Sequence, residues 1–376
     1  MTLPPPGTAP MRVLIVDDSA FMRASLRHIV GNTPGFVVAG EATDGLTGVE
    51  AIRSLRPDIV TLDIDMPGLD GIGVLKRVRA SAAGPPVFIM VSAFTTQGAS
   101  LTLTALSCGA IDFVPKASEH FKTDLAQVGE LLRGKLAIAA AILTGRDRPP
   151  ARPAAQIPAS ASQPITAQPA APAQPLPPAR RPAATGAPDV VVIASSTGGP
   201  QTLPLVLGPA CPFKAPIVIA QHIPPVFSRS LADSLAATLG VAVVEAEDGR
   251  ELSPNTVYLL PGGRNGELVR VRAGVFALRL LDEGTAVYRP NADILFRSAA
   301  LSARRPVGLI LTGMGTDGTE GARALSQRGC PVLVQDPASA VIWGMPRSAI
   351  DAGLATEVLD APGLGQRLAA MVEKSG

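Results

Sequence analysis

The sequence is poor in cysteine, histidine and aromatic residues, and it contains no long apolar run. Its three cysteines, Cys108, Cys211 and Cys330, are far apart, so neither a disulfide framework nor a zinc site of paired cysteines is expected. No segment approaches the roughly 18 apolar residues of a membrane span, and we expect no membrane insertion. The first ten residues hold four prolines and no basic segment, unlike a signal peptide. A reducing, cytoplasmic location is therefore expected.

An excess of either charge is also missing. The chain has 33 basic and 31 acidic residues and a net charge of +2, so nothing draws it as a whole toward nucleic acid or an anionic membrane. Apolar residues make up 47% of the sequence, although only 3% are aromatic. This is ample for hydrophobic cores, and 376 residues exceed one typical domain. We expect two domains, no nucleic-acid partner and a monomer.

A segment rich in proline and alanine marks the boundary between the domains. Residues 149–188 contain 12 prolines, 13 alanines and no acidic residue, a composition typical of an extended linker. A proline-rich ligand for a partner domain is the alternative interpretation. The predicted organisation is a disordered tail over residues 1–10, a first domain over 11–145, a Pro/Ala-rich linker over 146–188 and a second domain over 189–376.

Short apolar runs alternate with helical segments in both halves of the chain. This alternation predicts an α/β fold with two doubly wound parallel-sheet domains. Residues 267–280 instead alternate polar and apolar positions around Ala273-Gly274, which indicates a β-hairpin. The expected strands are residues 11–16, 36–39, 59–62, 87–91, 112–114, 190–194, 217–220, 257–260, 307–311 and 332–334. The expected helices are residues 20–30, 47–55, a segment after Gly71, 99–108, 125–143, 203–207, 228–239, 293–303 and 320–328.

Polar residues follow the predicted strands of the first domain. Asp17 and Asp18 follow the first strand, Asp63 the third and Ser92 the fourth, while Lys116 lies just past the fifth. The carboxyl ends of parallel strands converge on one crevice in a doubly wound sheet. Three carboxylates so close together need a cation between them, and oxygen ligands of this kind suit Mg²⁺. A carboxylate beside Mg²⁺ and a lysine is a good phosphoryl acceptor.

These considerations assign a role to each member of the cluster. Asp63 is the predicted phosphoacceptor. Asp18, Asp63 and the backbone carbonyl of Asp65 are the predicted metal ligands, with Asp17 in support. The Lys116 ammonium and the Ser92 hydroxyl group are expected to contact the phosphoryl oxygens. Taken singly, Asp17-Asp18 could be a helix cap and Lys116 a surface residue, but the combination at the strand ends favours a site.

Residues 11–120 resemble a response-regulator receiver domain. The strings LIVDDSAFMR, LDIDMPGLDG, FIMVSAF and GAIDFVPK carry this resemblance. It implies phosphotransfer from a histidine kinase to Asp63. It also implies a switch in which Ser92 moves toward the phosphoryl group and Phe113 rearranges. Lys116 belongs to the same group of switch residues.

The second domain contains a single histidine, His222, which is therefore its only candidate for imidazole chemistry. His222 follows the strand IVIA and Gln221. Ser196 lies in the turn SSTGGP after the strand VVVIA, and Asp317 lies in GMGTDG after VGLIL. Because all three follow parallel strands, they can meet as nucleophile, general base and orienting carboxylate. Taken alone, His222 would be structural more often than catalytic, and Asp317 a turn residue.

The turn after Ser196 supplies candidate donors for an oxyanion. Gly198 and Gly199 allow a tight turn that exposes backbone N–H groups, including that of Thr197, at the start of a helix. The Met314 N–H is expected to join them. A phosphate-binding loop has a similar shape, but the Gly-Lys-Ser/Thr of a Walker loop is absent, as is a G-x-S-x-G elbow. No cofactor is expected in this domain.

Residues 189–376 resemble the catalytic domain of the CheB family of chemotaxis protein-glutamate methylesterases. The strings SSTGGPQTL, IAQHIPPVF, VYLLPGG, LTGMGTDGTEGA and QDPASAVIWGMP carry the resemblance. It implies hydrolysis of glutamate γ-methyl esters, and deamidation of glutamines, on methyl-accepting chemotaxis receptors. It also implies that the nucleophile is Ser196 and not Ser195. The sequence departs from the family pattern where Ala194-Ser195 replaces the usual Gly-Ala, and where Pro337 replaces a frequent Glu.

The leading hypothesis is a methylesterase that is activated by phosphorylation. We expect the unphosphorylated receiver to cover the Ser196 crevice, because a tether holds even a weak inhibitor at roughly millimolar effective concentration. A nucleic-acid-binding output would need a basic patch or a helix-turn-helix, which this sequence does not offer. The other alternative is a non-catalytic binding module or scaffold in a chemosensory complex, against which the intact Ser196, His222 and Asp317 argue.

Overall fold

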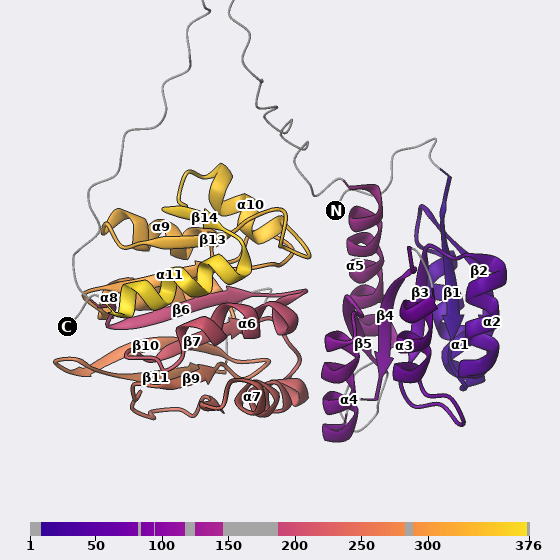
Figure 1. Cartoon of the computed structure of the whole chain (residues 1–376), viewed down its shortest axis with the longest axis horizontal. Coiled ribbons are helices and arrows are strands. Elements are labelled where there is room, and N and C mark those ends of the chain that lie inside the picture. Colours follow the sequence, from indigo (N-terminus) through magenta and orange to yellow (C-terminus); the bar gives the residue numbers. More distant parts are fainter. Residues whose placement is uncertain are drawn as a thin grey trace, which may run out of the picture.

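The computed structural model describes residues 9–81, 84–93, 95–116, 125–145, 187–282 and 289–373. In these ranges the chain forms two separate parallel sheets, each covered by helices, and one antiparallel hairpin (Figure 1). The predicted α/β fold with two doubly wound sheets is confirmed. The tail expected over residues 1–10 and the linker expected over 146–188 fall almost entirely outside the described residues. No helix in the described ranges is long and apolar enough to cross a membrane.

The first sheet has five strands in the order β2-β1-β3-β4-β5. Its strands alternate buried side chains between two faces, as a doubly wound sheet requires: Val13 and Ile15 pack with α1 and α5, and Leu14 and Val16 pack on the opposite face. The strands are β1 (Met11–Val16), β2 (Phe36–Ala42), β3 (Ile59–Asp63), β4 (Val87–Ser92) and β5 (Asp112–Pro115). The helices are α1 (Ala20–Gly31), α2 (Gly45–Leu55), α3 (Gly71–Ser81), α4 (Thr96–Ser107) and α5 (Leu125–Thr144).

The second sheet has seven parallel strands in the order β14-β13-β12-β6-β7-β9-β8. The strands are β6 (Val190–Ser195), β7 (Ile217–Gln221), β8 (Ala242–Glu245), β9 (Thr256–Leu259), β12 (Pro306–Ile310), β13 (Val332–Gln335) and β14 (Glu357–Leu359). The helices are α6 (Gly199–Leu207), η2 (Gly208–Ala210), α7 (Pro225–Leu239), α8 (Ala292–Ser302), α9 (Thr319–Gln327), α10 (Gly344–Asp351) and α11 (Ala361–Glu373). The hairpin of β10 (Asn265–Arg272) and β11 (Val275–Leu281) turns at Ala273-Gly274, as predicted.

The strand order of the second sheet reverses at β6. From β6 the chain adds β7 on one side and later returns to add β12 on the other. Adjacent loops therefore leave the carboxyl end of β6 on opposite sides, and such a switch point is where open α/β sheets generally bind their ligands. The three segments expected to carry the chemistry of this domain all leave the sheet here.

The two domains pack directly against each other. Figure 1 shows α4 and α5 of the first sheet facing α6 and α7 of the second. Buried residues of α4, such as Leu103 and Leu106, belong to the same hydrophobic cluster as Leu203 of α6 and Leu231 of α7. The first domain thus shares a hydrophobic core with the second.

Five described elements of the second domain were not expected from the sequence: β8, β14, α10, α11 and the short helix η2. The two strands are short and lie at the two edges of the sheet, so they lack the continuous apolar run that marked the central strands. α6 and α7 also begin earlier than predicted, because both start at glycine or proline positions that read as loop in the sequence. A proline in the first helical turn is compatible with a helix.

Gly71 supports the end of β3 by direct backbone contact. An added Cβ there would lie 2.1 Å from the Asp63 carbonyl oxygen, whereas at Gly31 it would meet nothing within 4 Å. Gly71→Ala should therefore destabilise the first domain by about 1–3 kcal/mol, and Gly31→Ala should be neutral or slightly stabilising. Hydrogen exchange of the β3 amides measures this locally. Equal exchange in the two variants would contradict the close packing.

Candidate active site and phosphorylation site

Ser196 is the first residue beyond β6, and its backbone is held from several sides. Its N–H donates to the Thr312 carbonyl at 3.0 Å, and its carbonyl accepts the Gly199 N–H at 2.8 Å. The turn needs glycine at 198, where φ is +82° and an added Cβ would lie 2.6 Å from Val341 Cβ. Ser196 is only 9% exposed. The structure thus presents its side chain from a fixed, mostly buried turn.

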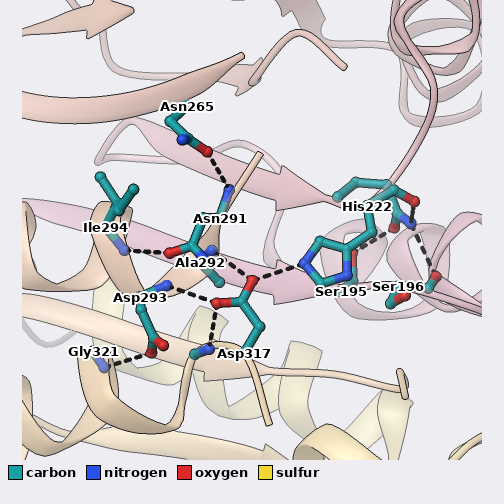
Figure 2. A network of polar contacts seen from close by, with 12 residues as sticks. Ser195, Ser196, His222, Asn265, Asn291, Ala292, Asp293, Ile294, Asp317 and Gly321 are labelled. Carbon is teal, nitrogen blue, oxygen red and sulfur yellow. Dashed lines mark hydrogen bonds and ion pairs between the residues drawn. The ribbon is translucent and has the colours of Figure 1, made fainter. Parts of the chain in front are cut away.

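His222 and Asp317 meet beside Ser196. His222 follows β7, and its N–H donates to the Ser195 carbonyl at 2.9 Å, which brings its backbone beside the nucleophile turn. Its Nε2 atom lies 2.7 Å from Asp317 Oδ2. Figure 2 shows the imidazole between Asp317 on one side and the two serines on the other. The sequence predicted that these three residues would meet, and the fold brings them together.

Asp317 is surrounded by hydrogen-bond donors. Its Oδ2 accepts the Ala292 N–H at 2.8 Å, and its Oδ1 accepts those of Asp293 at 3.1 Å and Gly318 at 3.0 Å. Ala292 and Asp293 begin α8, so the carboxylate lies at the positive end of that helix (Figure 2). Burial alone would raise the pKa of Asp317, but the hydrogen bonds from His222 and the backbone outweigh it and lower the pKa.

The Asp317 carboxylate determines which ring nitrogen of His222 carries the proton. An ionised Asp317 can only accept hydrogen bonds, so the proton of the 2.7 Å contact belongs to His222 Nε2. In the neutral ring the lone pair is then on Nδ1, the nitrogen on the side of the serines in Figure 2. The contact with Asp317 therefore fixes the tautomer of the imidazole, as the predicted role of His222 as general base requires.

The loop of Gly313 and Met314 lies against the nucleophile. An added Cβ on Gly313 would be 2.7 Å from Ser196 Cβ, so the Met314 peptide follows a backbone that is already in contact with the serine. Of the turn residues predicted to hold an oxyanion, Gly199 is excluded as a donor, because its N–H is bonded to the Ser196 carbonyl. Gly199 serves the turn, and the amides of Thr197, Gly198 and Met314 remain predicted donors.

In the first domain three carboxylates gather at the ends of β1 and β3. One oxygen from each of Asp17, Asp18 and Asp63 lies within 4.8 Å of the others. Lys116 Nζ donates to Asp63 Oδ2 at 2.6 Å and lies 3.4 Å from Asp17 Oδ2. Asp17 Oδ2 is buried, and apart from this 3.4 Å ion pair it accepts no hydrogen bond from the described residues. The structure brings together the acidic residues and the lysine that the sequence singled out.

This carboxylate cluster fits a divalent cation. Burial raises the pKa of Asp63 to about 6, against the opposing effect of Lys116, and burial also raises the pKa of Asp17. Burial would lower the pKa of Lys116, but Asp63 and Asp17 together raise it. A single ammonium does not compensate the buried acids, and their oxygen-only donor set suits Mg²⁺. The predicted Asp65 carbonyl ligand is not tested by these contacts, although the Asp65 N–H donates to Asp63 Oδ1 at 3.3 Å.

The predicted switch residues are engaged elsewhere in this structure. The Ser92 hydroxyl donates to the Gly98 carbonyl at 3.1 Å and accepts from Thr102 Oγ1 at 2.7 Å, both in α4. Phe113 is 7% exposed, and its ring centroid lies 4.3 Å from that of Phe227 in α7. The aromatic residue of the receiver therefore contacts the second domain directly.

A polar contact across the domain boundary touches the residue next to Ser196. Thr197 Oγ1 donates to Asp112 Oδ2 at the start of β5. Lys135 of α5 pairs with the same carboxylate and also lies 3.4 Å from Thr197 Oγ1. Nearby, Gln201 Nε2 donates to the carbonyls of Leu106 at 3.2 Å and Ala110 at 2.9 Å. The receiver thus binds both the nucleophile turn and the helix that follows it.

The sequence predicted a helix over residues 293–303, which is α8, but assigned it no part in holding Asp317. It also gave no role to Asp112, Lys135 or Gln201. For α8 a signal existed: Asn291 caps the helix by accepting the Ile294 N–H at 3.0 Å, and Asn before an apolar-periodic segment is a typical helix start. For the other three residues the signal is absent, because their role depends on how two domains dock.

Comparison with known proteins assigns a family to each domain. Residues 13–125 match the response regulator receiver domain family and residues 191–368 match the CheB methylesterase family. A protein-glutamate methylesterase/protein-glutamine glutaminase 1 of Oleidesulfovibrio alaskensis is 39% identical over 97% of this chain and the whole of the relative. A second such protein, from Nitratidesulfovibrio vulgaris, is 41% identical over 93% of this chain and 95% of the relative. The solved CheB methylesterase catalytic domain of Thermotoga maritima is 38% identical, with a TM-score of 0.47, over 50% of this chain and all of that structure.

Fold, sites and relatives together define an enzyme of the response-regulator class, in which a receiver domain is joined to a hydrolase domain. Within that class, the chain belongs to the CheB family of protein-glutamate methylesterases.

Asp317 and the neighbouring Asp293 of α8 should affect the free energy of unfolding with opposite pH dependences. Because the pKa of Asp317 is lowered on folding, its stabilising effect is present above its unfolded pKa and is lost as pH falls below about 4. The difference in unfolding free energy between the wild type and Asp317→Asn should therefore shrink from pH 5 to about pH 3.

Asp293 provides the matched control. Burial raises its pKa, so the wild type should lose stability relative to Asp293→Asn as pH rises above about 4. Urea unfolding followed by the fluorescence of Trp343, the single tryptophan, measures both differences in the second domain. Parallel pH profiles for the two variants would show that the donors around Asp317 do not hold it ionised.

Proposed function

We propose that the protein hydrolyses glutamate γ-methyl esters, and deamidates glutamines, on methyl-accepting chemotaxis receptors, and that phosphorylation of its receiver activates it. The observation that carries the proposal is the fixed carboxylate–imidazole pair beside Ser196, with His222 Nε2 2.7 Å from Asp317 Oδ2. Membership of the CheB family supports the substrate class.

The chemistry follows from the three side chains. Ser196 Oγ attacks the γ-carbonyl carbon of the ester while His222 takes the hydroxyl proton, and Asp317 stabilises the resulting imidazolium. Collapse of the tetrahedral intermediate expels methoxide, which receives the proton from His222 and leaves as methanol. Water, deprotonated by His222, then hydrolyses the acyl-enzyme to glutamate and restores Ser196. With glutamine as substrate, ammonia leaves in place of methanol.

The negative charge of the tetrahedral intermediate needs backbone donors. We assign this role to the amides of Thr197, Gly198 and Met314, which lie around the nucleophile turn. Loss of one such donor raises a barrier by about 2.7–4 kcal/mol in comparable hydrolases.

In the receiver, Asp63 is the proposed nucleophile toward a phosphoryl group donated by a histidine kinase. Asp17, Asp18 and Asp63, with the Asp65 carbonyl, would hold Mg²⁺, which when bound neutralises charge on the transferred phosphoryl group. Lys116, already bonded to Asp63 Oδ2 at 2.6 Å, would move its hydrogen bond to a phosphoryl oxygen. Ser92 would exchange its α4 partners for another of these oxygens.

The contacts between the domains support inhibition by the unphosphorylated receiver. Asp112 bonds to the Thr197 hydroxyl, directly beside Ser196, and Phe113 packs on Phe227. A receptor helix that presents its ester to Ser196 competes for the same turn. Rearrangement of Ser92 and Phe113 on phosphorylation would weaken this docked state, and the receptors and the kinase are the partners this function requires. We expect the protein to act in the cytoplasm as a monomer.

Methanol release from methylated receptor membranes tests the function. With Mg²⁺ present, we expect release to rise on addition of a small-molecule phosphodonor, and to fall by at least about 10⁴-fold in Ser196→Ala because the nucleophile is gone. The donor effect should vanish in Asp63→Asn. Ser234→Ala, an exposed serine of α7, is the matched control and should behave as the wild type.

The alternatives give different results in this assay. Release that ignores the phosphodonor would keep the esterase and remove the proposed regulation. No release in either condition, with cognate receptors present, would favour the scaffold function.

Weakening the docked receiver should raise the activity of the unphosphorylated protein. Gln201→Ala removes the two hydrogen bonds to Leu106 and Ala110, each worth about 0.5–1.5 kcal/mol, without touching the catalytic residues. Methanol release without phosphodonor should increase about fivefold or more, while release with phosphodonor stays the same.

Gln327→Ala, an exposed glutamine at the end of α9, is the control for this substitution and should leave both rates unchanged. If residues 189–376 alone were no faster than the unphosphorylated full chain, inhibition by the receiver would be rejected.

A further inference from the structure

The backbone ladder between β6 and β7 stops where the two catalytic residues leave the sheet. The last paired residues are Ser195 and Gln221, and the final backbone bond runs from the His222 N–H to the Ser195 carbonyl at 2.9 Å. The next two carbonyl groups, those of Ser196 and His222, therefore have no partner in the β6–β7 ladder. The Ser196 carbonyl accepts the Gly199 N–H within its own turn at 2.8 Å, which does not connect it to the segment of His222.

The side chain of Gln221 supplies the missing connection. Its Nε2 group donates to the Ser196 carbonyl at 2.9 Å and to the His222 carbonyl at 3.0 Å, which uses both of its protons. Gln221 is 2% exposed, so water does not compete for these bonds. One buried amide thus ties the backbone of the nucleophile to the backbone of the general base.

Two neighbours fix the orientation of this amide. The Ser195 hydroxyl donates to Gln221 Oε1 at 2.6 Å. A rotation of the amide by 180° would place Oε1 against two carbonyl oxygens and lose both of the bonds that Nε2 makes. Gly199 leaves the space required, since an added Cβ would lie 2.0 Å from Gln221 Oε1 and 3.0 Å from Ser195 Oγ.

We propose that Gln221 is a positioning residue whose amide holds the carbonyls of Ser196 and His222 and thereby sets the approach of the serine hydroxyl to the imidazole. Ser195 assists by holding Oε1. This inference rests on the proposed hydrolase function. It explains why a buried polar side chain ends the otherwise apolar strand IVIAQ. Beyond the last backbone pair, the hydrogen bonds between the two segments are made by this side chain.

The test uses the full-length protein with Mg²⁺ and a phosphodonor, labelled by a fluorophosphonate that reacts with the activated serine. The rate constant reports on positioning, and the final stoichiometry by intact mass reports on the folded fraction. Gln221→Met keeps the length and removes both donors. We expect its rate constant to fall about 10- to 100-fold, with the final stoichiometry of the wild type. Ser195→Ala, which leaves both carbonyl bonds, should lower the rate constant by less than Gln221→Met does.

Gln221→Glu gives a second readout that a purely structural role would not change. A carboxyl group can donate to a carbonyl only while protonated, so the rate constant of this variant, divided by that of the wild type, should fall as pH rises. His222, Asp317, Asp112 and Lys135 are present in both proteins, so the ratio removes the part of the pH dependence that the two proteins share.

A rate constant within about twofold of the wild type for Gln221→Met, a loss of stoichiometry at an unchanged rate constant, or a ratio for Gln221→Glu that does not vary with pH would each overturn the assignment. If Gln221→Met does not fold, the pH ratio alone decides. Absence of labelling in the wild type would reject the proposed function, and this inference with it, whereas equal labelling rates reject the inference alone.

Discussion

The pairing of β6 on both sides is the constraint on which the active site depends. Because β12 and β7 lie in parallel register with it, the loops after all three strands leave the same edge of the sheet, and three residues distant in sequence become neighbours. The register also brings the backbone of Gly313 against Ser196. The backbone hydrogen bonds of the sheet therefore bring the three segments together, and side-chain contacts beyond the strand ends, such as those of Gln221, complete the geometry.

The two domains treat their essential carboxylates in opposite ways. Asp317 is buried among donors from α8 and from His222, and these keep its pKa low. Asp63 is buried with other acids and one lysine, and its pKa is raised to about 6. The first arrangement gives a permanent anion that orients a base. The second gives a group whose charge depends on the cation and phosphoryl group that it meets, which suits a switch.

Most of the fold was predictable from the sequence, because central parallel strands are continuous apolar runs and residues such as Asp63 and His222 mark where those runs end. The edge strands β8 and β14 were not predictable, since three or four partly exposed residues carry little pattern. The contact of Asp112 with Thr197 was also out of reach, because it depends on how two independently patterned domains dock. Gln221 was visible as a polar residue at the end of a buried strand, but only the orientation of its amide reveals what it binds.

The bond between Asp112 and Thr197 has a consequence for the receiver as well as for the esterase. Docking of the receiver on the Ser196 turn and binding of substrate at Ser196 exclude each other, and such events are coupled reciprocally. If phosphorylation of Asp63 favours substrate access to Ser196, then occupancy of Ser196 favours the phosphorylated receiver by the same free energy. A high local density of receptor esters would then raise the phosphorylated fraction of the enzyme. The phosphorylation level of such a protein depends on the concentration of its substrate as well as on the kinase.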